Sequence, residues 1–316
     1  MYLRSLADLH IHMHEDAPPY KWCSVEDIAK VALERNVRLI GVVEHYGSAL
    51  LHYGTIENYC AKVRRQIEAV ERKFPKIEIL LGIEASILTV NGELDIKPEE
   101  ARLLDFLIIG MHHVPAGGRC LPYEMKGKIS VGDVRNNPAY QSFLRKFKLD
   151  DLIVDWQEAT LSLMDNPFVS IYAHPVQWPI VVMRKFFVKL RPSEEWRINR
   201  IEDLVTPDIA QEIFSAAREA GIAWEVNNGF LPVRFRVDNE YVCCKDDSNS
   251  WSGLIDLFRM VGKYGVKVSL GTDAHVPMEL RRVGRLANAI ELLRLAGVSE
   301  ENIILRKSQV RLCREL

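Results

Sequence analysis

The chain has 316 residues, of which 48% are hydrophobic and 27% charged, a composition typical of a globular protein with a sizeable core. Its formal net charge of −2 gives no general electrostatic reason to bind nucleic acid or an anionic membrane surface. Because no apolar run is long enough to span a membrane and the first residues lack the apolar core of a signal peptide, we expect a cytoplasmic protein.

Apolar runs typical of strands alternate with helical patterns in the first half of the chain. Strands are predicted at residues 3–9, 39–43, 77–81 and 106–109. Helices are predicted at residues 25–35, 56–74 and 98–104, the first with Ser24 as its N-cap and the last with Pro98 in its first turn. Residues 114–147 are rich in Gly, Pro and Asn and too long for an ordinary loop, so we expect an excursion that covers the site.

The second half of the chain continues the same alternation. Strands are predicted at residues 169–173, 222–226 and 266–270, with a short apolar run at 303–305. Helices are predicted at residues 150–164, 207–220, 254–264 and 284–295. A basic and aromatic segment at about 180–205 is interpreted as a second excursion rather than a nucleic-acid stacking surface. Repeated strand–helix units favour one α/β domain over residues 1–316, with a parallel sheet closed into a TIM-barrel-like structure.

Histidines and acids gather where the predicted strands end. Eight of the nine histidines lie at or just past such an end, whereas a lone His-x-His pair would more often be a core or surface feature. Side chains two residues apart on a strand point the same way, and the carboxyl ends of barrel strands meet at one face. The residues that should converge there are His10, His12, His45, Glu84, His112, His174, Asp273 and His275.

This set is larger than the four ligands that Zn²⁺ usually takes, so it would serve two or three divalent ions, with Glu84 able to bridge two of them. Imidazole and carboxylate ligands without thiolate suit Zn, Mn or Fe. The six cysteines contain no Cys-x-x-Cys pair and are interpreted as reduced, mostly structural thiols. Metal ions about 3.5–4 Å apart can activate water and stabilise phosphoryl oxygens, so we predict hydrolysis of a phosphoester.

The order of these motifs resembles the PHP (polymerase and histidinol phosphatase) family over nearly the full length of the chain. The matching motifs are Asp8-Leu-His10-x-His12, Glu44-His45, Gly82-x-Glu84, Gly110-Met-His112, Ala173-His174-Pro175 and Gly271-Thr-Asp273-Ala-His275. The resemblance implies a distorted (β/α)7 barrel with up to three metal ions at its C-terminal face. It also makes histidinol phosphate one candidate substrate.

The resemblance further implies how the ligands are shared among the ions. The first ion would be held by His10, His12, Glu84 and Asp273. The second would be held by Glu84, His112 and His174. The third would be held by His45 and His275 with one ligand from the loop after the first strand. Family members generally have a His or Asp there; this chain offers Asp16, which has the best spacing, besides His14 and Glu15.

Other residues near the strand ends have predicted supporting roles. Arg119, Arg281 and Arg282 follow ligand-bearing strands, and we expect at least one guanidinium to bind the substrate phosphate. Glu44 could orient a ligand histidine, and His52 is expected in a loop.

Two further sets of residues are assigned with alternatives left open. His113 is expected to support the site or pack rather than to bind metal. Glu225, Asn227 and Asn228, at the end of the sixth strand, are expected to contact substrate or to form a structural turn.

The sequence thus predicts a metal-dependent phosphoesterase that hydrolyses a small phosphomonoester through a metal-bound hydroxide. Glu84 and Asp273 are the predicted catalytic residues, with Asp273 or a histidine beside a ligand handling protons. One alternative is a metal-dependent C–N hydrolase of the amidohydrolase type, which also begins with His-x-His but usually needs a carboxylated lysine where this chain has Gly-Met-His-His. A nuclease acting on nucleic-acid ends and a vestigial metal-binding module are the remaining alternatives; the near-neutral charge disfavours the nuclease.

Overall fold

The computed structural model describes residues 5–14, 22–112, 117–118, 138, 142, 145–175, 203–231 and 248–313. Within these residues the strands form one sheet in the order β7-β6-β5-β4-β3-β2-β1-β8, in which every pairing is parallel. The strands are β1 (Leu6–His12), β2 (Val37–Val43), β3 (Glu78–Ser86), β4 (Phe106–Gly110), β5 (Ile171–Ala173), β6 (Ala223–Asn227), β7 (Val268–Gly271) and β8 (Ala274–His275).

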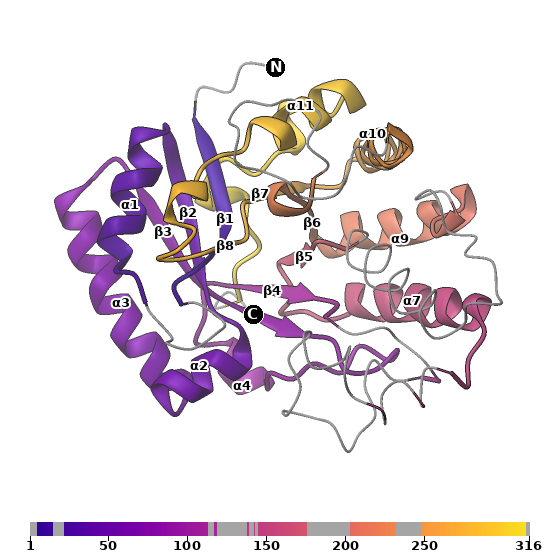
Figure 1. Cartoon of the computed structure of the whole chain (residues 1–316), viewed down its shortest axis with the longest axis horizontal. Coiled ribbons are helices and arrows are strands. Elements are labelled where there is room, and N and C mark those ends of the chain that lie inside the picture. The colour runs from indigo at the N-terminus through magenta and orange to yellow at the C-terminus, as the bar shows by residue number, and fades with distance from the viewer. Residues whose placement is uncertain are drawn as a thin grey trace.

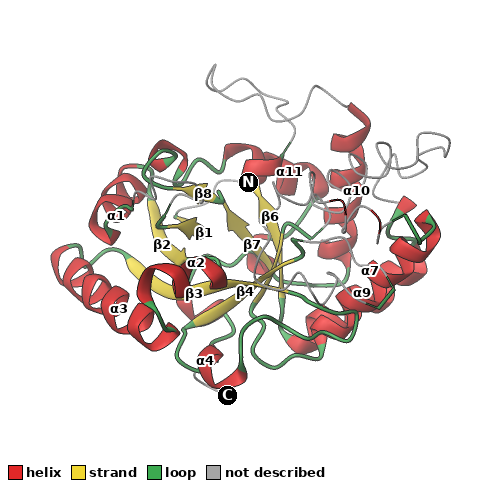
Figure 2. Cartoon of the chain, turned by 60° about the horizontal axis from the view of Figure 1, so that its bottom comes forward, coloured by secondary structure: helices red, strands yellow, loops and turns green. Residues whose placement is uncertain are grey.

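The sheet curls so that its last strands return to its first (Figure 2). Two residues after β7, the N–H of Asp273 donates to the carbonyl oxygen of His10 at 2.8 Å, and β8 then pairs with β1 through Ile11 and His12. The predicted TIM-like barrel is therefore confirmed. The described sheet has eight strands rather than the predicted seven, because the two-residue β8 is too short to give a periodic signal.

Helices cover the outer face of the sheet (Figure 1). They are α1 (Val25–Glu34), α2 (Tyr46–Tyr53), α3 (Ile56–Lys73), α4 (Pro98–Ala101), α7 (Leu149–Met164), α9 (Pro207–Ala220), α10 (Ser248–Lys263) and α11 (Ala287–Ala296). Short 3₁₀ turns occur at η4 (Asn228–Phe230), η5 (Leu280–Arg282), η6 (Glu300–Asn302) and η7 (Lys307–Gln309). None of the helices in the described ranges is long and apolar enough to cross a bilayer.

The local signals that predicted the helices act as expected. The Ser24 hydroxyl accepts the N–H of Asp27 at 3.1 Å, which satisfies one of the unpaired donors at the start of α1. Gly221 ends α9 in the left-handed conformation, with φ of 71°, where a residue without a Cβ is favoured. In α1 the buried residues recur at helical spacing, so one face packs on the sheet.

Several predicted boundaries were wrong. His52 lies in α2, a helix that the sequence did not reveal, rather than in a loop. β1 and β3 continue past residues 9 and 81, so the ligand candidates of those strands lie within the strands and are fixed by the sheet. α10 begins at Ser248 rather than at 254, and α4 ends at Ala101 rather than at 104. The two predicted excursions lie largely outside the described residues.

The barrel interior is closed at the end opposite the histidines. Phe106, at the start of β4, is fully buried, and its ring lies so close to Gly41 and Gly82 that a Cβ on either glycine would be 2.6 Å from it. The C-terminal segment covers the amino ends of the strands: the N–H of Ile304 donates to Val268 at 2.8 Å, and that of Cys313 to Asp105 at 2.9 Å. The other end of the barrel therefore carries the site, as in other barrels of this type.

Candidate metal centre

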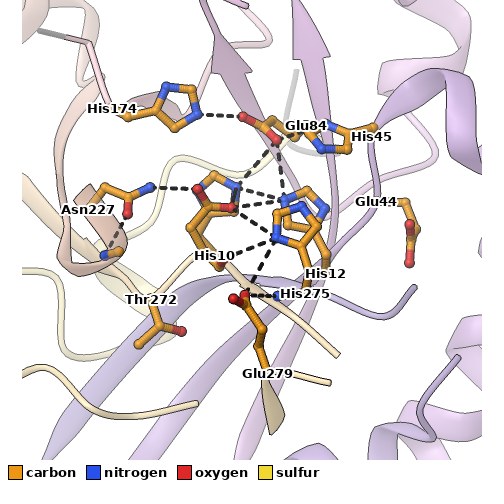
Figure 3. A network of polar contacts seen from close by, with 12 residues as sticks. His10, His12, Glu44, His45, Glu84, His174, Asn227, Thr272, His275 and Glu279 are labelled. Atoms are coloured by element: carbon orange, nitrogen blue, oxygen red, sulfur yellow. Dashed lines mark hydrogen bonds and ion pairs between the residues drawn. The ribbon is translucent and has the colours of Figure 1, made fainter. Parts of the chain in front are cut away.

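Glu84, near the end of β3, lies between His174 and His45 and faces the imidazoles of His10 and His12 (Figure 3). It is 1% exposed. Its Oε2 lies 3.0 Å from His45 Nδ1, 3.3 Å from His12 Nε2 and 3.4 Å from His10 Nε2. Three imidazoles from β1 and the end of β2 thus face a single carboxylate oxygen.

The other oxygen of Glu84 faces the opposite side of the cluster. Its Oε1 lies 2.9 Å from His174 Nε2 and 3.0 Å from His112 Nε2, so the residues after β4 and β5 meet here. The second nitrogen of His112 is 2.8 Å from the hydroxyl of Ser86. Gly110 makes room for this arrangement, because a Cβ there would lie 2.5–2.6 Å from atoms of His112 and Glu84.

Asp273 supplies the second carboxylate of the cluster. Its Oδ1 lies 3.3 Å from His12 Nε2, 3.5 Å from His10 Nε2 and 3.8 Å from His275 Nδ1, and its Oδ2 accepts the amide of Asn227 at 3.2 Å. Its φ is 51°, in a region that residues with a Cβ rarely adopt. Strained backbone held by its surroundings is common at functional sites.

The donor set fits divalent metal ions. Among the described residues, candidate ligand atoms form three groups, and within each group the atoms lie within 4.8 Å of one another. The groups are His12 with His45 and His275, His10 with His12 and Asp273, and His45 with Glu84 and His112. Glu84 Oε2 is buried and makes no regular hydrogen bond to the described residues, although imidazole nitrogens face it. Buried imidazole and carboxylate lone pairs that converge on one space are what a Zn, Mn or Fe site requires.

The electrostatics of the cluster keep both carboxylates charged. Burial alone would raise the pKa of Glu84, but the charges of His112, His10 and His45 hold that pKa well below its usual value. The pKa of Asp273 is likewise lowered, against burial, chiefly by His10. Burial opposes ionisation of His10, yet Glu225, Asp273 and Glu84 raise its pKa well above the usual value. A cation binding here would replace protons on these imidazoles.

The end of β6 also belongs to this cluster. The Nδ1 of His10 is 2.8 Å from Glu225 Oε1, and Glu225 Oε2 accepts the N–H of His174 at 2.8 Å. The amide of Asn227 donates to Glu225 Oε2 at 3.3 Å and to Asp273 Oδ2 at 3.2 Å. Asn228 instead accepts the N–H of Ala289 at 3.0 Å, a structural contact. The structure thus places Glu225 and Asn227 beside the candidate ligands.

His14 does not join the cluster. Its Nδ1 lies 2.5 Å from Glu44 Oε1, which also accepts the N–H of Met13 at 2.9 Å, and its ring stacks on His52 with centroids 4.4 Å apart. Glu44 therefore orients His14 rather than one of the clustered histidines. Glu15, Asp16 and His113 lie outside the described residues.

The predicted phosphate-binding arginines have different surroundings. The guanidinium of Arg282 donates to Glu279 Oε2 at 2.5 Å and to the carbonyl oxygen of Thr272 at 3.2 Å. Glu279 also accepts the N–H of His275 at 3.0 Å, so Arg282 is joined to the segment that carries a candidate ligand. Arg281 is exposed on the same turn. Arg119 lies outside the described residues.

Asp8 is a supporting residue: it belongs to the first motif, but no role was predicted for it. Its two oxygens accept the N–H of Thr272 at 3.0 Å, the hydroxyl of Thr272 at 2.7 Å and the N–H of Gly284 at 2.8 Å. Asp8 thereby fixes the turn that leads to Asp273. Its spacing of two residues from His10 was an available signal, because alternate residues of a strand share a face.

No family model matches the chain. Relatives named as probable phosphatases are similar to it over most of its length. One from Thermoanaerobacter sp. (strain X514) is 22% identical over 300 residues, covering 94% of this chain and 89% of the relative. Another, from Clostridium acetobutylicum, is 23% identical over 300 residues, covering 92% of this chain and 88% of the relative.

Among solved structures, the chain is similar to the crystal structure of histidinol phosphate phosphatase from Lactococcus lactis subsp. lactis Il1403, complexed with zinc, L-histidinol and phosphate. The TM-score is 0.53 with 16% sequence identity, and the match covers 97% of this chain and 98% of the other. This likeness shows a shared fold. Together with the relatives named as phosphatases and the cluster of candidate ligands, it supports a metal-dependent phosphoesterase, a hydrolase of phosphate esters.

Proposed function

We propose that this protein hydrolyses a small phosphomonoester at a centre of two or three divalent ions, which could be Zn, Mn or Fe. The observation that carries the proposal is the convergence of five imidazoles within 3.4 Å of the two oxygens of Glu84. A carboxylate that faces imidazoles on both sides is suited to bridge two ions.

The proposed ligand sets keep the partition that the PHP resemblance implies, and contacts between the described residues support it. The first ion would be held by His10, His12, Glu84 and Asp273. The second would be held by Glu84, His112 and His174. The third would be held by His45 and His275, near His12, with Asp16 as the proposed further ligand.

Divalent ions bound there would supply Lewis acidity to the phosphoryl oxygens and lower the pKa of a bound water. The chain's own residues decide the geometry. The side chains of His45 and His275 are 28% and 25% exposed, whereas that of His10 is 0% exposed, so the substrate would approach from the side of His45 and His275.

Two side chains near this side of the site are suited to transfer a proton and to stabilise the charge of a phosphate. Asp273 is held by the amide of Asn227 with its Oδ1 toward the histidines, where it could accept and return a proton. Arg282, beside Glu279 and His275, could place its guanidinium against a phosphate oxygen. Glu84 would act as the bridging carboxylate that balances the charge of the ions.

A small substrate is favoured by the comparison and by charge. The similar Lactococcus lactis phosphatase is complexed with L-histidinol and phosphate, both small molecules. The net charge of −2 gives this chain no general attraction for a polyanion. Histidinol phosphate is therefore one substrate to test, within a wider set of phosphomonoesters.

The experiment is a metal-loaded phosphate-release screen of the unaltered protein and of two variants, His12→Ala and Asp273→Ala. Each variant should lose hydrolysis while keeping its far-UV circular dichroism, because each change removes a proposed ligand. Phosphodiesters, oligonucleotides and amides serve as comparison substrates. Retained hydrolysis in metal-free protein, or faster cleavage of an amide than of any phosphoester, would overturn the proposal.

A further inference from the structure

We propose that Glu225 is a positioning residue that holds ligands of two different metal ions with one carboxylate. Glu225 lies in β6 and is 2% exposed. A buried carboxylate is costly unless it is well hydrogen-bonded, so its partners indicate what it is there to hold. Those partners are His10, His174 and Asn227. The proposal rests on the metal centre of the proposed function.

The first oxygen of Glu225 determines which ring nitrogen of His10 keeps its hydrogen. A carboxylate can only accept, so at 2.8 Å from Glu225 Oε1 the His10 Nδ1 must carry the hydrogen. When a bound cation has displaced the other ring proton, the free nitrogen would be Nε2, which faces His12, Glu84 and Asp273. This is the tautomer that binds a metal ion, and carboxylates that orient a ligand histidine raise metal affinity.

The second oxygen of Glu225 acts through the backbone of His174. It accepts the His174 N–H at 2.8 Å, at a residue whose φ of 32° is unfavourable for a side chain with a Cβ. This contact holds the start of the loop after β5, from which the His174 ring reaches Glu84 at 2.9 Å. Glu225 thus links a proposed ligand of the first ion with one of the second.

The neighbouring strand leaves room for this carboxylate. A Cβ at Gly271, at the end of β7, would lie 2.1 Å from Glu225 Oε1 and 2.7 Å from the Cβ of His10. Any larger residue would push the carboxylate away from the histidine. The amide of Asn227 completes the arrangement, since it donates to Glu225 Oε2 at 3.3 Å and to Asp273.

The Glu225→Gln variant tests the inference, because glutamine keeps the size but has one acceptor and one donor in place of two acceptors. If the glutamine oxygen faced His10, its amide NH₂ group would face the His174 N–H, so two donors would meet. If the amide were flipped, its NH₂ group would donate to His10 Nδ1 and favour a hydrogen on Nε2, the nitrogen proposed to bind metal. We expect Co²⁺ to bind about 10- to 100-fold more weakly to the variant than to the unaltered protein.

The measurement is a titration of metal-free full-length protein with Co²⁺, followed by calorimetry and by the visible absorption of bound Co²⁺. Asp105→Asn is the matched control. Asp105 is also a buried carboxylate, which accepts the N–H of Leu81 at 2.9 Å and pairs with Arg64, but it lies at the far end of the barrel. Thermal unfolding without metal reports the structural effect of each change.

Weaker Co²⁺ binding and an altered spectrum in Glu225→Gln but not in Asp105→Asn would support the inference. Lower thermal stability with unchanged Co²⁺ binding, or equal weakening in both variants, would overturn it. If Glu225→Gln does not fold, Glu225→Asp, which keeps the charge but cannot reach both partners, is judged by the same outcomes. Absence of Co²⁺ binding in the unaltered protein would instead contradict the proposed function.

Discussion

A methyl group added at Gly110 should disable the centre without removing any ligand. Built on Gly110, a Cβ would lie 2.5 Å from His112 Cε1 and 2.6 Å from both His112 Nε2 and Glu84 Oε1. Ordinary contact begins at 3.4 Å, so these nitrogen and oxygen atoms would have to move by about 0.8 Å. That exceeds the roughly 0.5 Å within which a catalytic arrangement must be held.

We therefore expect Gly110→Ala to lower kcat/KM for the best phosphomonoester by about 100-fold, which corresponds to about 2.7 kcal/mol. The free energy of unfolding should fall by only about 1–3 kcal/mol. The assay is phosphate release under saturating metal, with urea unfolding of the same samples. Gly47→Ala is the control, because no atom lies within 4 Å of a Cβ there. Full activity in folded Gly110→Ala would refute the reasoning.

Three further predictions concern residues around the centre. Gly82→Ala should lower the free energy of unfolding by about 1–3 kcal/mol, because its Cβ would lie 2.6 Å from the Phe106 ring, but should leave metal binding unchanged. Urea unfolding and a metal titration check the two expectations. Adding Phe106→Leu to the variant should restore part of the lost stability. His14→Ala should keep metal content and activity, since His14 is bonded to Glu44; loss of one bound ion on elemental analysis would show that His14 is a ligand. Burial raises the pKa of Asp8 from its usual 3.8 to about 6, against the effect of its hydrogen bonds. Between these two pH values the folded protein holds a proton on Asp8 that the unfolded chain has lost, so the free energy of unfolding falls as the pH rises from 3.8 to about 6. Asn does not titrate, so in chelator the free energy of unfolding of Asp8→Asn should fall short of that of the unaltered protein by up to about 3 kcal/mol more near pH 4 than near pH 7. An equal difference between the two proteins at both pH values would rule this out.

The positions of the candidate ligands could be predicted from sequence because they depend on simple periodicity. His10 and His12 share a face of β1, and parallel strands bring the ends of β3, β4 and β5 to the same edge of the sheet. Glu84, His112 and His174 therefore meet although they are far apart along the chain.

The supporting contacts could not be predicted in the same way. Glu225 reaches His10 across 215 positions of sequence, and nothing in the local pattern of β6 reports the hydrogen bonds of its carboxylate. The same holds for the room left by Gly110 and Gly271, which depends on side chains of other strands. α2 was missed because an eight-residue helix with a single buried residue, Ala49, gives little amphipathic signal.

Metal-dependent hydrolysis is tested most directly by elemental analysis of the purified full-length protein combined with phosphate release before and after chelation. We expect two or three Zn, Mn or Fe ions per chain and hydrolysis of a small phosphomonoester, with loss of that hydrolysis in chelator and its recovery when the metal is returned. A protein that holds no metal, or that hydrolyses its substrate equally well after chelation, would contradict it.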